Sequence, residues 1–167
     1  MKPLNVWSHS DEEIGQRLSN FAHTPFELDG VSYASVEGFY VSILTQSSES
    51  RRNKVRGLWG FRAKREMPAR KPEVFRYGSD EIRLGSKEHH ALVKRAIRAK
   101  LEAHPDIAQQ LVATHPRPII HETGHPDPPG AEFPKDVLCR ILSELREEFA
   151  ASNRNMPPEP DDSSPAA

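Results

Sequence analysis

The sequence predicts a single α+β domain that is mostly helical and has a few short strands. In several long stretches, apolar residues recur at intervals of three and four, which is typical of helices with one buried face. Near the N-terminus, an Asp-Gly pair separates two short alternating runs, which indicates a β-hairpin. Strand and helix patterns do not alternate regularly, so a doubly wound sheet is not expected.

The composition limits the class of protein. The chain has 167 residues, enough for one domain with a real core, and we assign that domain to residues 1–151. Its 23 Lys and Arg nearly balance its 24 Asp and Glu, so no protein-wide field gathers nucleic acid. The single cysteine, Cys139, excludes a disulfide within the chain and a four-cysteine zinc site.

The two ends of the chain lead to further expectations. The first ten residues contain no apolar stretch of signal-peptide length, and no segment approaches the roughly 20 apolar residues that span a bilayer. We therefore predict a cytoplasmic protein without a membrane partner. Residues 152–167 are rich in Pro, Ser and acid, and we predict a disordered tail there.

The N-terminal half contains five predicted elements. Residues 4–7 are a short strand candidate, and Asp29-Gly30 joins strands at 26–28 and 31–33. Ser35 is the expected N-cap of a helix over residues 36–46. A more polar helix is expected at about 50–59, whereas residues 67–77 give no clear pattern.

The C-terminal half is dominated by helices. Ser86 is a second N-cap, for a helix that ends near Ala103, and Pro105 begins a short helix. A short strand at 118–121 and a Gly/Pro-rich loop at 124–134 follow. The last helix is expected to run from Pro134 to about Ala150.

Four segments, taken together, resemble the NADAR (YbiA-like) family of small N-glycosidases, and they occur in the family's order between about residues 18 and 146. They are Leu18-Ser19-Asn20-Phe21 with Pro25-Phe26-Glu27-Leu28-Asp29-Gly30; Ser35-Val36-Glu37-Gly38-Phe39-Tyr40; Arg98-Ala99-Lys100-Leu101 with Arg117-Pro118; and Lys135-Asp136-Val137-Leu138-Cys139-Arg140.

The resemblance implies cleavage of the bond between a ribose and a base. Substrates known for the family include phosphorylated pyrimidine intermediates of riboflavin synthesis and ADP-ribose attached to guanine in nucleic acid. Breaking such a bond creates positive charge at the anomeric carbon, which a carboxylate stabilises while it positions or activates water. Glu37, in the first turn of a helix, is the candidate for that carboxylate. No cofactor is expected.

The same resemblance assigns substrate contacts around Glu37. Asn20 is expected to hydrogen-bond the ribose or base, and Phe21 to stack on the base. Tyr40 follows Glu37 by three residues, on the same helix face, and is expected either to border the pocket or to fill the core. Lys100 is the candidate for a phosphate contact.

A second acidic segment is expected to complete the site. His121 and Glu122 are assigned to substrate binding, and Asp127 takes the place of a family Asp as a second catalytic residue. We expect one of these three to approach Glu37 to within about one water molecule.

Departures from the family pattern support a different class of function. Gly38 replaces the family's His, and Asp136 replaces an Asn. The alternative is therefore a non-catalytic protein that binds nucleotides or ADP-ribose on the same fold, or serves as an interaction protein.

Other chemistries are weaker alternatives. A metal held by His121, His125 and Asp127 lacks helical spacing, so no metal site is expected. Cys139 is expected to be a structural thiol within a helix. Residues 51–65 contain seven cations with Trp59 and Phe61 among them. This basic run is either a solvated helix face or, if it lies beside Glu37, a surface for ADP-ribosylated nucleic acid or a pyrophosphate-bearing nucleotide.

Overall fold

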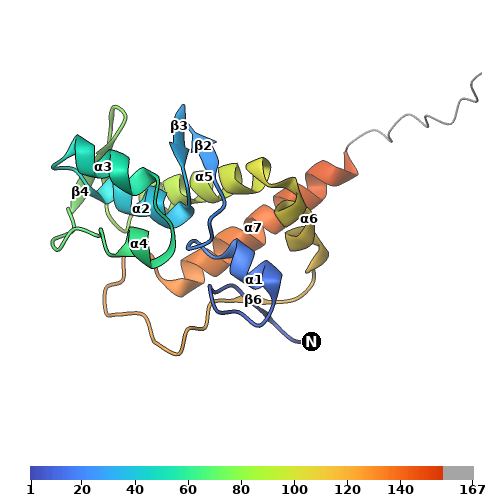
Figure 1. The fold of residues 1–167 in the computed structure, drawn as a ribbon. Helices are drawn as coiled ribbons and strands as arrows, with labels where there is room; N and C mark the ends of the chain where they lie inside the picture. Colours follow the sequence, from blue (N-terminus) through green and yellow to red (C-terminus); the bar gives the residue numbers. More distant parts are fainter. Residues whose placement is uncertain (156–167) are drawn as a thin grey trace, which may run out of the picture.

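The computed structural model describes residues 1–155, which form seven helices and six short strands. The α+β, mostly helical architecture is the predicted one (Figure 1). The helices are α1 Glu13–Leu18, α2 Val36–Leu44, α3 Glu49–Arg56, α4 Gly60–Lys64, α5 Lys87–Ala103, α6 Pro105–Ala113 and α7 Lys135–Arg154, and the strands are β1 Leu4–Asn5, β2 Phe26–Leu28, β3 Val31–Tyr33, β4 Val74–Tyr77, β5 Asp80–Arg83 and β6 Ile119–Ile120.

The two long helices, α5 and α7, form the frame of the molecule, and the shorter elements pack around them (Figure 1). The predicted apolar stripe of α5 is buried, from Leu92 to Leu101. Its outward face is polar, since Lys94 bonds Glu144 and Glu148 of α7 at 2.8 Å each. One continuous core of apolar side chains therefore lies between α2, α5, α6 and α7.

The strands form three separate pairs. The predicted hairpin pairs β2 with β3, and both turn residues, Asp29 and Gly30, have positive φ as such a turn requires. The two short strands β1 and β6 pair in parallel, and they bring the two halves of the chain together.

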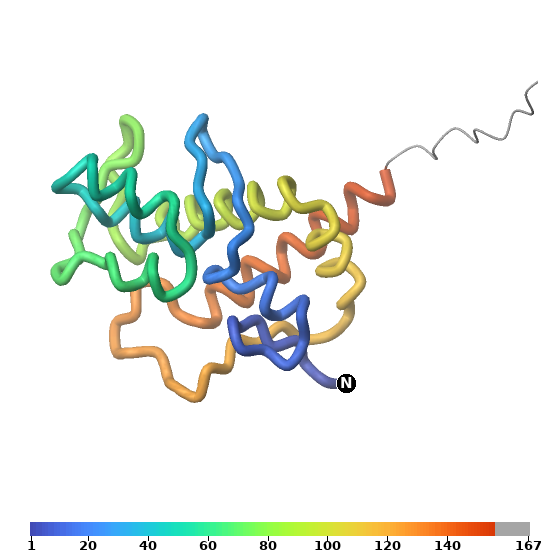
Figure 2. The backbone as a smooth tube through the Cα atoms, in the orientation of Figure 1, coloured from blue at the N-terminus to red at the C-terminus, as the bar shows by residue number. Residues whose placement is uncertain are grey.

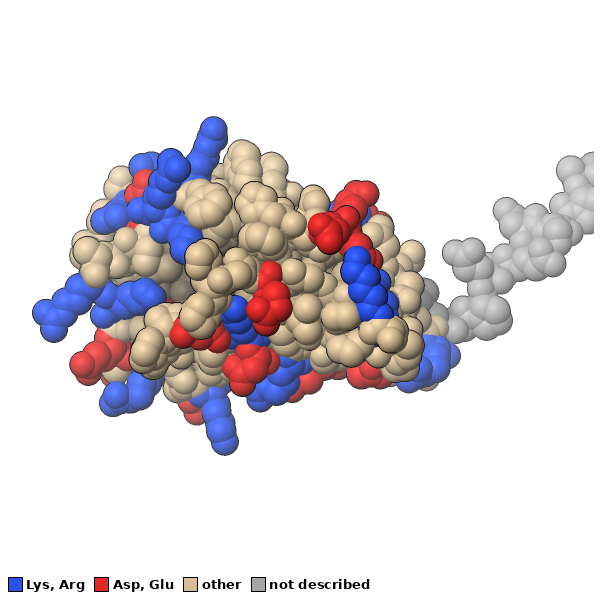
Figure 3. Space-filling model, turned by 90° about the horizontal axis from the view of Figure 1, so that it is seen from below, with Lys and Arg blue, Asp and Glu red and all other residues tan. Residues whose placement is uncertain are grey.

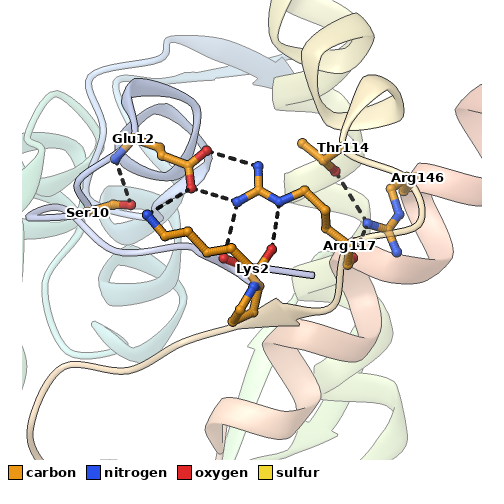
Figure 4. Close-up of polar contacts among 7 residues, drawn as sticks. Lys2, Ser10, Glu12, Thr114, Arg117 and Arg146 are labelled. Atoms are coloured by element: carbon orange, nitrogen blue, oxygen red, sulfur yellow. Dashed lines mark hydrogen bonds and ion pairs between the residues drawn. The ribbon is translucent and has the colours of Figure 1, made fainter.

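A polar network holds the N-terminal segment to the turn after α6 (Figure 4). The Arg117 guanidinium donates to both carboxylate oxygens of Glu12, at 2.6 and 2.9 Å, and to the carbonyls of Lys2 and Pro3. Arg146 of α7 donates to the Arg117 carbonyl at 2.7 Å. This network makes the N-terminal segment a fixed part of the domain.

The structure adds elements that the sequence analysis did not predict. Helix α1, the short helix α4 and the antiparallel pair β4–β5 were all missed. The last helix was predicted too short, because α7 continues through the first residues of the expected tail to Arg154. The remainder of that predicted tail, 156–167, lies outside the described residues.

The Gly/Pro-rich loop predicted at 124–134 is part of a longer loop over residues 121–134, which Figure 2 traces between β6 and α7. Among residues 1–155, no helix is both long and apolar enough to cross a membrane.

Candidate active site around Glu37

The start of α2 is fixed by a cap and by a close backbone contact. The predicted N-cap is confirmed, since Ser35 Oγ accepts a hydrogen bond from the Gly38 N–H at 2.9 Å. The Ser35 hydroxyl also donates to the Leu58 carbonyl at 2.9 Å. A Cβ on Gly38 would lie 2.6 Å from the Leu58 oxygen and 2.9 Å from that of Val55. The glycine found in place of the family's His is therefore required by this contact.

The loop that carries Asn20 and Phe21 lies directly against the start of α2. The Glu37 N–H donates to the Asn20 carbonyl at 2.9 Å, and the Gly60 N–H donates to that of Phe21 at 3.0 Å. Asn20 Oδ1 is buried and has no hydrogen-bond partner within residues 1–155. The structure therefore brings Asn20 and Phe21 against the start of the Glu37 helix. The Asn20 side-chain oxygen there is a hydrogen-bond acceptor without a partner in the described chain.

The Glu37 carboxylate is surrounded by protein but is not paired with a cation. The residue is half-buried, and its side chain makes no hydrogen bond or salt bridge with any other residue of the described chain. Desolvation raises the pKa of Glu37 to about 7, against the weaker opposing pull of the Lys64 and Lys71 charges. The carboxyl group therefore exchanges its proton near neutral pH, as a general acid or base requires.

A second carboxylate reaches this region from the long loop. Glu132 accepts a hydrogen bond from the Tyr40 hydroxyl at 3.3 Å and forms a salt bridge with Lys71. Burial works against ionisation of Glu132, but these partners, Lys71 foremost, hold its pKa below the ordinary value. Lys71 and Glu132 also line a hollow of about 410 Å³.

The charges of both carboxylates act on Tyr40. It is 8% exposed, and burial raises the pKa of its hydroxyl, with the charges of Glu132 and Glu37 adding to that effect. Two carboxyl groups with pKa values displaced in opposite directions thus act on one phenol. Such a pair is the arrangement in which one acid carries a proton while the other stays ionised.

His89 supports Tyr40 from the core side. Its ring lies 5.5 Å from that of Tyr40, and its Nδ1 accepts a hydrogen bond from the Gly85 N–H at 3.1 Å. Desolvation lowers the pKa of His89 to about 4, so the imidazole is neutral at physiological pH. A neutral ring packs against the phenol without adding positive charge to the site.

Lys100 occupies a different place from the one expected. It is 1% exposed, and its ammonium donates to the Ser19 carbonyl at 2.9 Å. Desolvation lowers its pKa to about 7. This interior position does not support the expected phosphate contact. Lys100 instead anchors the loop that presents Asn20 and Phe21.

The segment at 121–127 is organised around Lys135 rather than around Glu37. Asp127 accepts a hydrogen bond from the Lys135 backbone N–H at 2.9 Å, at the start of α7, and Glu122 lies 3.8 Å from the Lys135 ammonium. The His121 ring donates to the Val6 carbonyl at 2.5 Å. The charges that act on the Glu37 pKa come from Lys64 and Lys71, and not from this segment. The contacts of these three residues are therefore made elsewhere, and the structure does not show the expected approach of this segment to Glu37.

Sequence reasoning missed three residues of this region: Lys64 and Lys71, whose charges act on Glu37, and Glu132, which pairs with Lys71. Lys64 belongs to the basic run at 51–65, but the sequence did not show that this lysine acts on Glu37. Lys71 lies in the unassigned stretch after α4, and Glu132 in the loop before α7. Neither segment has a periodic pattern from which the direction of its side chains can be predicted.

The rival chemistries gain no support. No group of three or more metal-binding side chains occurs in the part of the chain described by the structure. Burial raises the pKa of the Cys139 thiol, which disfavours the thiolate that a nucleophile needs.

Comparisons with known proteins identify the fold and show which proteins the chain resembles. No family model matches the chain. The chain is 26% identical over 150 residues to N-glycosidase YbiA from Shigella boydii serotype 4 (strain Sb227), covering 88% of both chains. YbiA from Shigella flexneri and Shigella sonnei matches to the same extent.

The similarity to YbiA is also found when the structures are compared. The NMR structure of E. coli YbiA superposes with a TM-score of 0.65 at 22% identity, covering 94% of this chain and 92% of that one. The fold is thus that of the YbiA-like domains. In sequence the chain is similar to these YbiA proteins, which carry the name N-glycosidase.

Proposed function

We propose that the protein is an N-glycosidase that hydrolyses the bond between ribose and base in a nucleotide-like substrate. The observation that carries this proposal is Glu37, a carboxyl group without a cationic partner in the described chain, half-buried, and with a pKa near 7. The relatives named N-glycosidase supply the reaction class.

The reaction requires a proton transfer and a stabilised positive charge. The C1′–N bond breaks with its electrons leaving on the base, and a water oxygen forms the new bond to C1′. Glu37 accepts the proton of that water, while its ionised form stabilises the positive charge at C1′. The departing base nitrogen takes up a proton from solvent.

Glu132 and Tyr40 hold the surroundings of Glu37 in place. The ionised Glu132 keeps Lys71 beside the site and fixes the Tyr40 hydroxyl. Neither group replaces Glu37, because the pKa of Glu132 is lowered and that of Tyr40 is raised. We therefore assign proton transfer to Glu37 and positioning to the other two.

Cations beside Glu37 favour a phosphorylated substrate. Lys64 and Lys71 both act on the Glu37 pKa, and the Gly60 N–H bonds the Phe21 carbonyl. One cation of the basic run, Lys64, therefore acts on Glu37, which supports the interpretation of that run as a surface for ADP-ribosylated nucleic acid. We propose ADP-ribose attached to guanine as the first substrate class and a phosphorylated ribosyl pyrimidine as the second.

The test compares wild type with Glu37→Gln on three substrates: ADP-ribosylated guanine DNA, an ADP-ribose conjugate and a ribosyl pyrimidine phosphate. We expect release of base or ADP-ribose by wild type, and a loss of about 10²–10⁴-fold in Glu37→Gln. Glu12→Gln is the matched control, since that carboxylate lies in the Arg117 network, and it should retain full activity.

Two results would overturn the assignment. Equal turnover by wild type and Glu37→Gln would remove Glu37 from the mechanism. Binding of these substrates by both proteins without turnover in either would favour the alternative, a non-catalytic binding protein in which the replaced family residues have abolished hydrolysis.

A further inference from the structure

A groove in the surface is lined by Phe21 but not by Glu37. It has a volume of about 650 Å³ and is formed by the loop before β2, helix α1 and the start of α4. Its lining includes Arg17, Phe21, His23, Trp59, Phe61 and His104, and contains no acidic residue. None of the steps assigned to Glu37 uses this groove.

The groove presents aromatic rings to solvent. Phe61 is 57% exposed and Trp59 is 37% exposed, and they are two of the four large exposed apolar side chains among residues 1–155. The His23 ring stacks on Trp59 with centroids 4.1 Å apart and an interplanar angle of 17°. Solvent-facing rings concentrated in one hollow mark a binding surface for planar groups.

Cations accompany these rings. The Arg62 guanidinium lies 5.8 Å from the centre of the Trp59 ring, and the Lys64 ammonium lies 5.6 Å from that of Phe21. Residues 49–71 contain nine Lys or Arg and two acids, although the whole chain is close to neutral. In Figure 3, seen from below, Lys and Arg gather towards the end of the molecule where α3 and α4 lie.

Charge and shape together indicate the class of ligand. Exposed rings bind bases by stacking, and an acid-free lining with flanking cations accommodates phosphates. Arg17 is held by Asp106 at 2.5 Å, so Arg62 and Lys64 are the cations that remain for phosphates. A free mononucleotide in the Glu37 site would leave this surface empty, whereas a chain of nucleotides would cover both.

Phe21 connects the two places. Its ring packs edge-on against Phe61 at 5.1 Å on the groove side and lies under Lys64, one of the cations that act on Glu37. A strand that places one nucleotide at Glu37 therefore directs its neighbours along Phe61 and Trp59. We propose that the groove binds the bases and phosphates of a single-stranded nucleic acid next to the nucleotide that the enzyme cleaves.

Only the position of the cleaved nucleotide rests on the proposed function, because the groove should bind an unmodified strand without any reaction. Full-length protein is titrated into fluorescein-labelled dT12 at low and moderate salt, and binding is followed by anisotropy. We expect salt-dependent binding that weakens at least tenfold in Phe61→Ala and in Trp59→Ala. The exposed Phe61 makes the first variant the safer one for folding.

Three controls identify the source of the binding. Val74→Ser alters an exposed apolar residue outside the groove and should bind dT12 like wild type. Glu12→Gln, in the Arg117 network away from the groove, should also bind normally. The chain has two tryptophans, so in Trp7→Phe the remaining fluorescence reports Trp59 alone, and dT12 should quench it.

The outcomes are distinguishable from those of the glycosidase test. Equal affinity of wild type and Phe61→Ala for dT12, or no binding at low salt, would overturn the groove proposal while leaving hydrolysis of small substrates untouched. Equally tight binding of inorganic polyphosphate or polyglutamate would show attraction to any polyanion and would likewise overturn it. Binding of dT12 without hydrolysis of any substrate would uphold the groove and refute the N-glycosidase.

Discussion

Glu12 and Glu37 are two carboxylates in opposite surroundings. Glu12 accepts two hydrogen bonds from Arg117, and those bonds foremost hold its pKa below the ordinary value. Glu37 has no such partner, and desolvation raises its pKa to about 7. The paired acid fastens one segment to another, whereas the unpaired acid remains free to react. Proteins tolerate the second arrangement where function requires it.

The largest expected effect concerns the frame that holds Glu37. Gly38→Ala places a methyl group 2.6 and 2.9 Å from two backbone oxygens, so α2 must shift. We expect a loss of about 2–3 kcal/mol in the free energy of unfolding, measured by urea denaturation, together with reduced activity.

Gly57→Ala is the matched control for that variant. Its nearest neighbour is the Lys54 oxygen at 3.7 Å, an ordinary contact, and its φ of −88° suits any residue. A loss as large in Gly57→Ala as in Gly38→Ala would contradict the close-approach explanation.

Breaking the paired region should affect stability alone. Arg117→Met removes the bonds to Glu12 and to two backbone carbonyls, and we expect a lower free energy of unfolding in urea denaturation. The kcat of the folded enzyme should not change. Arg95→Met breaks the more exposed pair with Asp29 and should lose at most about 1 kcal/mol. A fall in kcat with Arg117→Met would mean that the two regions are coupled.

Replacing Glu37 or Glu12 by the neutral Gln should change the free energy of unfolding in opposite directions. Because the folded pKa of Glu37 is raised, its ionisation destabilises the fold as pH rises from about 4.5 to about 7. Glu37→Gln should therefore gain about 1–2 kcal/mol at pH 8 and almost nothing at pH 4.

Glu12→Gln should behave in the opposite way. Since the folded pKa of Glu12 is lowered, its charge stabilises the protein above pH 4.5, and that contribution disappears as the pH falls through the folded pKa. The variant should lose stability at pH 8 and match wild type in strong acid. Thermal unfolding of both variants across this pH range measures the signs, and two shifts of equal sign would refute the contrast.

The smallest expected effect is a change in a pH profile. Lys64 lowers the pKa of Glu37, so Lys64→Met should move the rising limb of kcat/KM to higher pH, by within about one pH unit. Lys54→Met, which removes the cation paired with Glu66 at 3.0 Å, should leave that limb in place. An unchanged or more acidic limb in Lys64→Met would show that another group controls the profile.

Local chemistry explains which elements were predictable. The caps Ser35 and Ser86 and the Asp29-Gly30 turn were read correctly because each depends on a few adjacent residues. The β4–β5 pair was missed because its strands are rich in charged residues and follow a proline-rich stretch, although Gly78 has the positive φ of a hairpin turn.

The site was less predictable than the fold. The start of α2 and its neighbours Asn20 and Phe21 were found because they form short, recognisable runs. Glu132 is 92 residues from Tyr40 and 61 from Lys71 along the chain, and only tertiary packing joins them. The charged residues at 121–127 had a suggestive composition, but their bonds are made to Lys135 and to the N-terminal segment.

Glu132 lies in a loop, and this position determines how readily it can be exchanged. Glu37 belongs to a helix that is buried almost throughout, whereas Glu132 comes from a surface loop. Loops accept insertions and substitutions far more readily than packed helices. Glu37 therefore lies in a packed part of the domain, and Glu132 lies where substitutions are better tolerated. We expect that exchanging residues 121–134 for the loop of a YbiA-like relative alters substrate choice while Glu37, the proposed catalytic carboxylate, stays unchanged.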